Sequence, residues 1–192
     1  AGWIPGADGI REKDGRRLRL VFQTPVNAVR QDFQALIKQE WHEIGVETEL
    51  KTVDPSVFFG GDAGAADTMQ KFHADIEMYA NNFEGNNPEP YLAQQTCDKA
   101  PSPDNQWQGE NHSRYCDPEY DRLIGEMTQI VDPAKRGELG KRLNDMLTKD
   151  SNAIIPLVDR GITSAVSNRL GGVALNAWDS ELWNVADWYR VK

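Results

Sequence analysis

The sequence predicts an α/β fold, a mixed sheet flanked by helices, from two strand-like segments and the helical pattern between them. Residues 17–24 and 46–53 alternate apolar with polar side chains, which is typical of β-strands. Between them, apolar residues recur every third or fourth position from Val29 to Ile44, which is typical of an amphipathic helix. If the two strands pair in parallel, this unit is expected to cross over right-handed.

Weaker signals place the next elements. Gly45 follows the helix at the position where a left-handed residue commonly ends one. Residues 55–72 predict a short helix that glycines interrupt, and residues 75–81 predict a third strand. A further short helix is expected within residues 88–96, ahead of a long polar loop.

Two amphipathic helices follow the loop, and both have the same start signal. Asp117-Pro118 and Asp132-Pro133 each supply an N-cap carboxylate and a proline for the first turn. The apolar stripes are Tyr120, Leu123, Ile124, Met127, Ile130 and Val131 in the first helix, and Leu139, Leu143, Met146 and Leu147 in the second. Residues 153–158 and 163–166 then predict two strands.

The tail carries three tryptophans, Trp178, Trp183 and Trp188. Such large side chains are expected to pack the tail onto the core or onto a neighbouring domain. No internal repeat or low-complexity linker divides the chain, so residues 1–192 are expected to form a single domain. The chain starts at Ala1-Gly2-Trp3 with neither a Met nor a signal peptide, which indicates a part of a longer protein.

Composition disfavours several partners and chemistries. The 30 acidic and 21 basic residues give a net charge of −9, which disfavours nucleic acid and anionic lipid. No apolar run approaches the roughly 20 residues of a membrane span. His42-Glu43 lacks the second His of an HExxH zinc site, and the sequence contains no GxSxG elbow. Residues 60–64 are glycine-rich but lack the Lys-Ser/Thr of a phosphate loop, so we expect no catalytic residues, metal or cofactor.

Two further motifs have simple alternatives. Residues 8–19 begin like a calcium loop, but Ile10, Lys13 and Arg19 stand where the third, sixth and twelfth residues of an EF-hand loop would be, so a turn is favoured. Asn111-His112-Ser113 fits a glycosylation sequon, which matters only in a eukaryotic secretory pathway.

Cys97 and Cys116 stand at the two ends of the polar loop, which is rich in Pro, Asn, Ser and Gly. A disulfide between them would stabilise the fold by about 3 kcal/mol and would imply an oxidising compartment. Two unrelated thiols in a cytosolic protein are the alternative. Neither cysteine belongs to a CxxC pair and no His has zinc-finger spacing, so a zinc site is disfavoured.

Several segments carry a resemblance when taken in order. The chain opens with AGW and continues with DGIREKDG at residues 8–15. Residues 111–124 read NHSRYCDPEYDRLI, similar to the pattern N-x-S-R-Y/W-x-N-P-E-x-D-x-L-I, and residues 132–136 read DPAKR, followed by IPL at residues 155–157. Over essentially its whole length the sequence resembles the family-5 extracellular solute-binding proteins, the peptide- and nickel-type binding proteins of ABC importers.

This resemblance implies a lobe like those of the type II periplasmic binding proteins. Residues 1–192 would be the C-terminal lobe of a longer two-lobed protein, whose N-terminal lobe this sequence lacks. The implied function is a substrate-binding component, not an enzyme, which captures peptides or a similar small polar solute and delivers it to a membrane permease. The implied location is periplasmic or extracellular, including lipid anchoring at the cell surface. The paired cysteines of dipeptide-binding relatives also fit Cys97 and Cys116.

The loop after the third predicted strand is the first candidate ligand site, because ligands of open α/β sheets bind beyond the carboxyl ends of the strands. Peptide-binding relatives carry W-x-x-D-x-x-x-P here, and their Asp pairs with the α-ammonium group of the ligand. Aligned through Pro88, Asn81 replaces the Trp and Glu84 replaces the Asp, so dipeptide specificity does not follow. A solvated turn is the alternative interpretation. The candidate ligand contacts of this loop are Asn81, Asn82, Phe83, Glu84 and Asn86.

Three further candidates lie in the polar loop and at its end. Arg114 could clamp a ligand carboxylate, or could pair with Glu119 or Asp121 and hold the helix start. Tyr115 is a candidate ligand contact beside it. Trp107 could line a cleft or cap the loop. Both interpretations of Arg114 and of Trp107 remain open at this stage.

Two other functions are considered. A carboxylate-based hydrolase would use Glu84 with Asp75 or Asp62, since such chemistry needs two carboxyl groups roughly 5–9.5 Å apart. A standalone interaction domain would use the tryptophan-rich tail as its binding surface.

Overall fold

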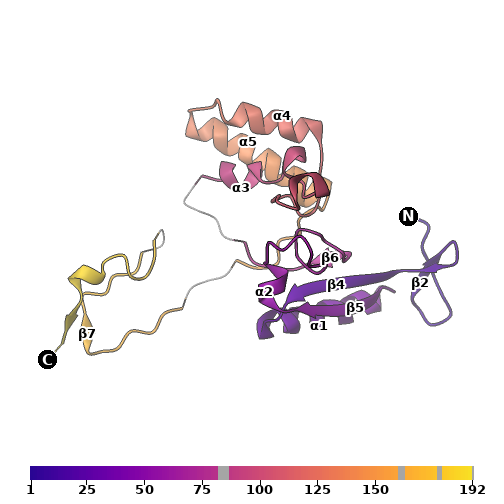
Figure 1. Cartoon of the computed structure of the whole chain (residues 1–192), viewed down its shortest axis with the longest axis horizontal. Helices are drawn as coiled ribbons and strands as arrows, with labels where there is room; N and C mark the ends of the chain where they lie inside the picture. The colour runs from indigo at the N-terminus through magenta and orange to yellow at the C-terminus, as the bar shows by residue number, and fades with distance from the viewer. Residues whose placement is uncertain (82–86, 160–162, 177–178, 192) are drawn as a thin grey trace.

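The computed structural model describes residues 1–81, 87–159, 163–176 and 179–191. Figure 1 shows a small N-terminal sheet, a parallel sheet covered by helices, a group of helices beside it, and a C-terminal segment that lies apart from these. The N-terminal sheet contains β1 (Ile4–Pro5), β2 (Arg11–Lys13) and β3 (Arg16–Arg17), all antiparallel.

The central sheet confirms the predicted strand–helix–strand unit and the α/β class. Its middle strand β4 (Arg19–Pro25) pairs in parallel with β5 (Glu47–Val53) on one side and with β6 (Ile76–Glu77) on the other. The order is therefore β5-β4-β6. A mixed sheet was expected, whereas these three strands are all parallel and antiparallel pairing occurs in the two small sheets. The third strand is also shorter than predicted.

Helix α1 (Ala28–Glu43) covers one face of the sheet. It begins at the N-cap Asn27, whose side chain accepts a hydrogen bond from the amide of Arg30. The rings of Trp41 and Phe22 pack with their centroids 5.7 Å apart. Gln34 is also buried in this interface, where its Nε2 donates to the carbonyl oxygen of Phe22 at 2.7 Å. The apolar stripe therefore includes an amide that satisfies a buried strand carbonyl.

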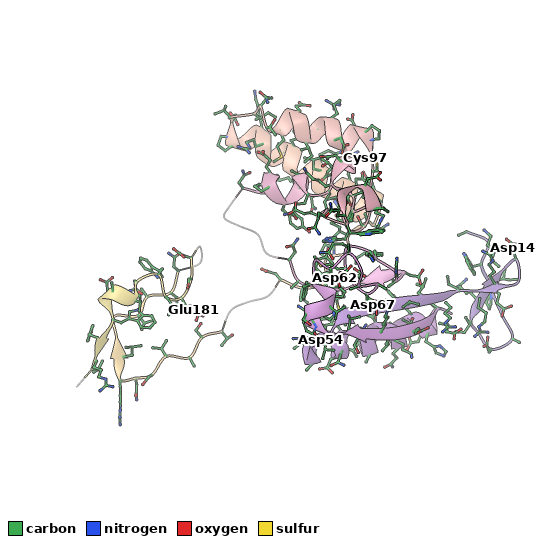
Figure 2. All side chains as sticks on the ribbon, viewed as in Figure 1. Asp14, Asp54, Asp62, Asp67, Cys97 and Glu181 are labelled. Carbon is green, nitrogen blue, oxygen red and sulfur yellow. A yellow bond between two sulfur atoms is a disulfide. The ribbon has the colours of Figure 1, made fainter. Side chains whose placement is uncertain are left out.

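The other face is covered by α2 (Pro55–Phe58) and the chain that follows it. Asp54 caps this single turn through the amide of Ser56 at 2.8 Å, and it is labelled in Figure 2. Phe58 is fully buried, and its carbonyl oxygen accepts a hydrogen bond from the amide of Met69. The segment predicted as an interrupted helix is thus helical only at its start.

The helical group contains α3 (Glu89–Ala93), α4 (Pro118–Met127) and α5 (Pro133–Asp145), and a π-helical turn (Met146–Asp150) continues α5. The predicted caps Asp117 and Asp132 are confirmed, since each accepts from main-chain amides of the first turn. Helix α4 ends before the last two residues of its predicted stripe, and Val131 is exposed. The core of the group comprises Leu92, Tyr120, Leu123, Ile124, Met127, Leu143, Met146 and Leu147.

The predicted strands at residues 153–158 and 163–166 are wrong. Both segments have the apolar content of strands, but in the described chain neither pairs with another strand, and their apolar side chains are largely exposed. The tail instead forms a small antiparallel pair, β7 (Leu170–Gly171) with β8 (Tyr189–Arg190).

The described tryptophans of the tail hydrogen-bond within it. Trp183 Nε1 donates to the carbonyl oxygen of Ala174 at 2.7 Å, and Trp188 Nε1 donates to Asn184 Oδ1 at 2.9 Å. Trp178 lies outside the described residues. As for membranes, no helix within the described ranges combines the length and the apolar character that a span requires.

Substitutions at two glycines test the predicted end of α1. Gly45 has a φ of +85°, and an added Cβ would lie 2.7 Å from the carbonyl oxygen of Gly9. Gly45→Ala should therefore lower the free energy of unfolding by about 2 kcal/mol or more. Gly137→Ala is the control, because Gly137 lies inside α5 with open space around its Cβ position. It should raise the free energy by roughly 0.5–1 kcal/mol. Urea unfolding measures both, and a neutral Gly45→Ala would contradict the assignment.

Candidate ligand-binding site

A polar row crosses the sheet near the carboxyl ends of its strands. Lys51 of β5, Gln23 of β4 and Glu77 of β6 are register partners, so their side chains project from the same face. Gln23 is fully buried, and its Nε2 donates to Glu77 Oε1 at 3.0 Å and to the carbonyl oxygen of Asp67 at 3.4 Å. Lys51 Nζ lies 2.6 Å from Asp67 Oδ1. Asp67 is labelled beside the sheet in Figure 2. The row is thus tied to the segment that covers it.

Arg114 joins the polar loop to that covering segment. Its Nη2 donates to the carbonyl oxygens of Gln70 at 2.9 Å and Lys71 at 3.1 Å, and its Nη1 donates to that of His112 at 3.0 Å. The backbone of Arg114 is left-handed, with a φ of 56°. These bonds to main-chain carbonyls give the guanidinium a structural role between two loops.

Arg114 does not pair with Glu119 or Asp121, the helix-start partners considered for it. Glu119 pairs instead with Arg122 at 2.8 Å, within α4. The carboxylate of Asp121 accepts from the amide of Cys97 at 3.1 Å. The acidic residues of this helix start therefore have partners of their own.

Trp107 meets the same covering segment. The Nζ of Lys71 lies 5.4 Å from the centroid of the indole ring, which is a cation–π contact, and donates to the carbonyl oxygen of Ala63 at 2.5 Å. The ring is only partly buried. Trp107 and Arg114, both proposed from the sequence, are thus brought together at residues 70–71, and Trp107 remains partly exposed.

Sequence reasoning missed a pair of largely buried side chains, Tyr79 and His112. Tyr79 follows β6, and its hydroxyl lies 3.1 Å from Nδ1 of His112. Burial lowers the pKa of His112 below its ordinary value and raises the pKa of Tyr79 to about 12, so both side chains are neutral at pH 7. Tyr79 belongs to the chain that leads to the candidate ligand loop, and His112 belongs to the disulfide loop, so the contact joins these two segments. No local pattern joins two residues so far apart in the sequence.

Two more of the sequence-predicted site residues are described, Tyr115 and Asn81. Tyr115 contacts the helical group, where its ring packs edge-on against Tyr120 at 5.4 Å and its hydroxyl donates to Asp117 Oδ2 at 3.3 Å. Asn81 is exposed at the end of the chain that follows β6. Asn82, Phe83, Glu84 and Asn86 lie outside the described residues.

The carboxylates considered for a hydrolase have main-chain partners. Asp62 Oδ1 accepts from the amide of Gly64 at 2.7 Å, and Asp75 Oδ2 accepts from the amide of Val21 at 2.7 Å. In the described part of the chain, no group of three His, Cys, Asp or Glu side chains is placed to hold a metal ion. These contacts give Asp62 a structural function in a turn and Asp75 one beside the middle strand β4.

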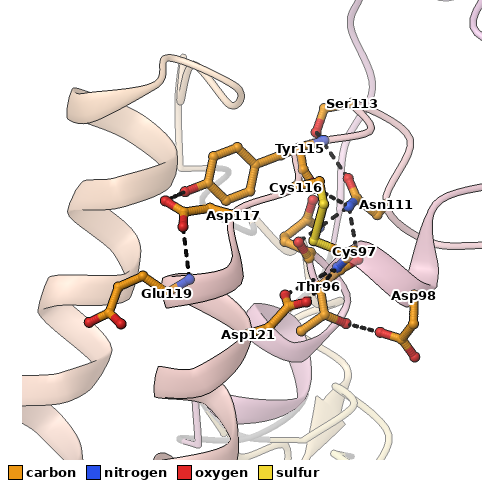
Figure 3. Close-up of a disulfide and its surroundings, with 11 residues drawn as sticks. Thr96, Cys97, Asp98, Asn111, Ser113, Tyr115, Cys116, Asp117, Glu119 and Asp121 are labelled. Atoms are coloured by element: carbon orange, nitrogen blue, oxygen red, sulfur yellow. Dashed lines mark hydrogen bonds between the residues drawn. A yellow bond between two sulfur atoms is a disulfide. The ribbon is translucent and has the colours of Figure 1, made fainter.

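Cys97 and Cys116 form a disulfide, as predicted, with a Cα–Cα distance of 4.6 Å (Figure 3). The side chain of Asn111 holds the chain on both sides of the bond. Its Nδ2 donates to the carbonyl oxygens of Gln95 at 3.2 Å, Thr96 at 3.0 Å and Tyr115 at 2.6 Å. Asn111 is fully buried. Its amide nitrogen is therefore enclosed in the folded chain and is not available for glycosylation.

The disulfide gives a direct mass prediction. Without reductant, the mass of the chain should be that of the reduced form less two hydrogens, and the native protein should take up no alkylating reagent. Reduction should lower the free energy of unfolding by about 3 kcal/mol, because the unfolded chain regains the entropy of the open loop. Labelling of both thiols in the native, unreduced protein would show that the bond is absent.

Asn111→Asp tests the amide clamp at constant size. The substitution replaces an NH₂ donor with a carboxylate oxygen that faces three carbonyl oxygens, and we expect a loss of about 3 kcal/mol or more in the free energy of unfolding. Asn27→Asp is the control, because Asp replaces Asn well at an exposed N-cap. Urea unfolding under oxidising conditions measures both. Equal midpoints for the two variants would show that the amide of Asn111 does not stabilise the loop.

No protein-family model and no curated protein matches the chain. Solved structures do match it. The oligopeptide-binding protein AppA from Bacillus subtilis, in complex with a nonapeptide, aligns with 100% of this chain at a TM-score of 0.66 and 18% identity. NikZ from Campylobacter jejuni, in complex with Ni(L-His), aligns with 98% of it at a TM-score of 0.69 and 15% identity. An ABC transporter substrate-binding protein from Sinorhizobium meliloti aligns with 100% at a TM-score of 0.62 and 21% identity.

The alignments cover only part of each matched chain. This chain corresponds to 35%, 36% and 35% of the three proteins, so it spans about a third of their length. Identities this low establish the fold alone. The resemblance indicated by the motifs is therefore confirmed at that level: the chain has the fold of about one third of an ABC-type solute-binding protein of the oligopeptide and nickel class.

Proposed function

We propose that the chain is the C-terminal lobe of a longer two-lobed solute-binding protein, the component of an ABC importer that captures its solute. The observation that carries this proposal is the alignment of the entire chain with about a third of solved binding proteins. Those two neighbours are named as binding proteins, which favours capture over catalysis. The longer protein would bind its solute between two lobes and deliver it to a membrane permease.

The proposed solute is a peptide or a similar small polar molecule. One neighbour holds a nonapeptide, another holds the peptide STSA, and a third holds a nickel–histidine complex. The proposed contacts are the loop residues Asn81, Asn82, Phe83, Glu84 and Asn86, together with Trp107. Trp107 is supported by its partial exposure and by its contact with Lys71. The structural partners of Arg114 and Tyr115 give less support to their proposed ligand contacts.

The proposed location is outside the cytoplasm, in the periplasm or at the cell surface. The disulfide supports an oxidising compartment. One matched structure is described as an ABC transporter-associated periplasmic binding protein from Helicobacter pylori. The acidic surface, with a net charge of −9, is unsuited to nucleic acid.

A comparison of the chain with the longer protein tests the proposal. A small ligand is bound tightly when most of its surface is buried, and this lobe alone would supply one wall of the cleft. In calorimetric titrations with one peptide mixture, the longer protein should bind with a dissociation constant of about 1 μM or below. The isolated chain should bind at about 1 mM or undetectably, a difference of about 4 kcal/mol.

Two further arms sharpen the titration. In one arm, nickel–histidine replaces the peptides. If the longer protein binds nickel–histidine but not the peptides, its solute is a metal complex and not a peptide. In the other arm, Glu84→Gln in the longer protein should weaken binding of peptides with a free α-ammonium group. Glu49→Gln is the matched control, because Glu49 is an exposed residue of β5 that pairs with Arg19. Tight peptide binding by the isolated chain would refute the two-lobe proposal.

A further inference from the structure

Two facing side chains in the central sheet have an unusual hydrogen-bond balance. Gln23 and Glu77 are register partners on β4 and β6, and Gln23 Nε2 donates to Glu77 Oε1 at 3.0 Å. The other oxygen of each side chain, Gln23 Oε1 and Glu77 Oε2, is buried and finds no hydrogen-bond partner among the described residues. The two side chains therefore share one hydrogen bond, while one buried oxygen on each of them has no donor in the described part of the chain.

The donors of Gln23 fix which way its amide points. Its Nε2 serves both Glu77 Oε1 and the carbonyl oxygen of Asp67, so exchanging the amide nitrogen and oxygen would set oxygen against oxygen twice. An ionised carboxylate at position 77 has no proton to give. Gln23 Oε1 would then remain without a donor, and each buried unsatisfied oxygen would carry a desolvation penalty. A neutral carboxylic acid has one O–H group, which removes this imbalance.

The surrounding charges act against a neutral acid, so burial has to outweigh them. From β5, Lys51 faces the row but is paired with Asp67 of the covering segment. From the disulfide loop, the guanidinium of Arg114 also favours the ionised form. Burial nevertheless raises the pKa of Glu77 to about 8, against the opposing effects of Arg114, Lys51 and the hydrogen bond from Gln23. Tyr79 is a neutral neighbour whose pKa is raised by burial and in part by Glu77, and its hydroxyl contacts the neutral His112.

We propose that Glu77 is held as the neutral acid and that its Oε2–H donates to Gln23 Oε1, closing a two-bond ring between β6 and β4. When Glu77 ionises, the proton passes to solvent, the second hydrogen bond is lost, and two buried oxygens are left without a donor. The ring is thus a proton-dependent latch on the strand that leads to residues 81–87. This inference does not depend on the proposed transport function.

The direction of the pH effect follows from the two states of Glu77. The pKa is raised in the folded chain, so between the ordinary value of 4.5 and about 8 the folded state holds a proton that the unfolded state has lost. The contribution of the latch is complete below pH 4.5. It declines as the pH rises from there to about 8, where Glu77 ionises in the folded chain too.

Carbon-13 NMR of the chain labelled at glutamate Cδ measures this ionisation directly. The Glu77 resonance, assigned by its absence in Glu77→Gln, should titrate with a midpoint near 8. A midpoint in the ordinary range of glutamate would overturn the proposal. The titration is recorded on the unaltered protein. If the variant folds poorly, through-bond correlation to the assigned backbone identifies the Glu77 resonance, so the measurement remains decisive.

Glu77→Gln provides the matching stability test, because its amide reproduces the neutral acid in shape and can donate from Nε2 to Gln23 Oε1. The ratio of the unfolding equilibrium constants, variant over unaltered chain, should fall about tenfold or more between pH 5 and pH 8. Using this ratio cancels the titration of His112, which both proteins share. Glu49→Gln, an exposed site in the same sheet, should show a flat ratio. A flat ratio for Glu77→Gln as well would also overturn the latch.

Discussion

The three hydrogen bonds from the amide of Asn111 hold the disulfide loop together. The helical group and the segment that covers the sheet are both attached to this loop. The three bonds fix residues 95–96 at one end of the polar loop and residue 115 at the other, so the two cysteines are brought within bonding reach. One step further along, Arg114 reaches from the same loop to the carbonyls of residues 70–71. Local satisfaction of one buried amide thereby fixes the helical group relative to the segment that covers the sheet.

Much of the fold could be predicted because its signals are local. The alternation in β4 and β5, the glycine after α1 and the Asp-Pro starts of α4 and α5 each depend on a few neighbouring residues. The strands expected at residues 153–158 and 163–166 were wrong for the opposite reason. A strand exists only through a partner strand, and the described chain provides none for these segments.

The candidate site could be predicted only in part. The general geometry of α/β sheets made the segment after β6 a candidate for ligand contacts, and Trp107 and Arg114 do meet the covering segment. The row formed by Gln23 with Lys51 and Glu77 could not be foreseen, because it depends on the register of three strands. A buried glutamine in a strand also looks like an ordinary polar position until its neighbours are known.

The two strands that pair with β4 should differ in how easily they separate from it. Phe22 pairs with Leu50 across the α1 crossover, and with Ile76, which is about twice as far along the chain. Doubling a loop adds only about 0.6 kcal/mol of closure entropy, so chain length alone hardly disfavours the second pairing. The lengths of the pairings differ far more, since seven residue pairs join β4 to β5 and two join it to β6. Sub-global opening should therefore begin at β6, and amide hydrogens there should exchange before those of the β4–α1–β5 unit.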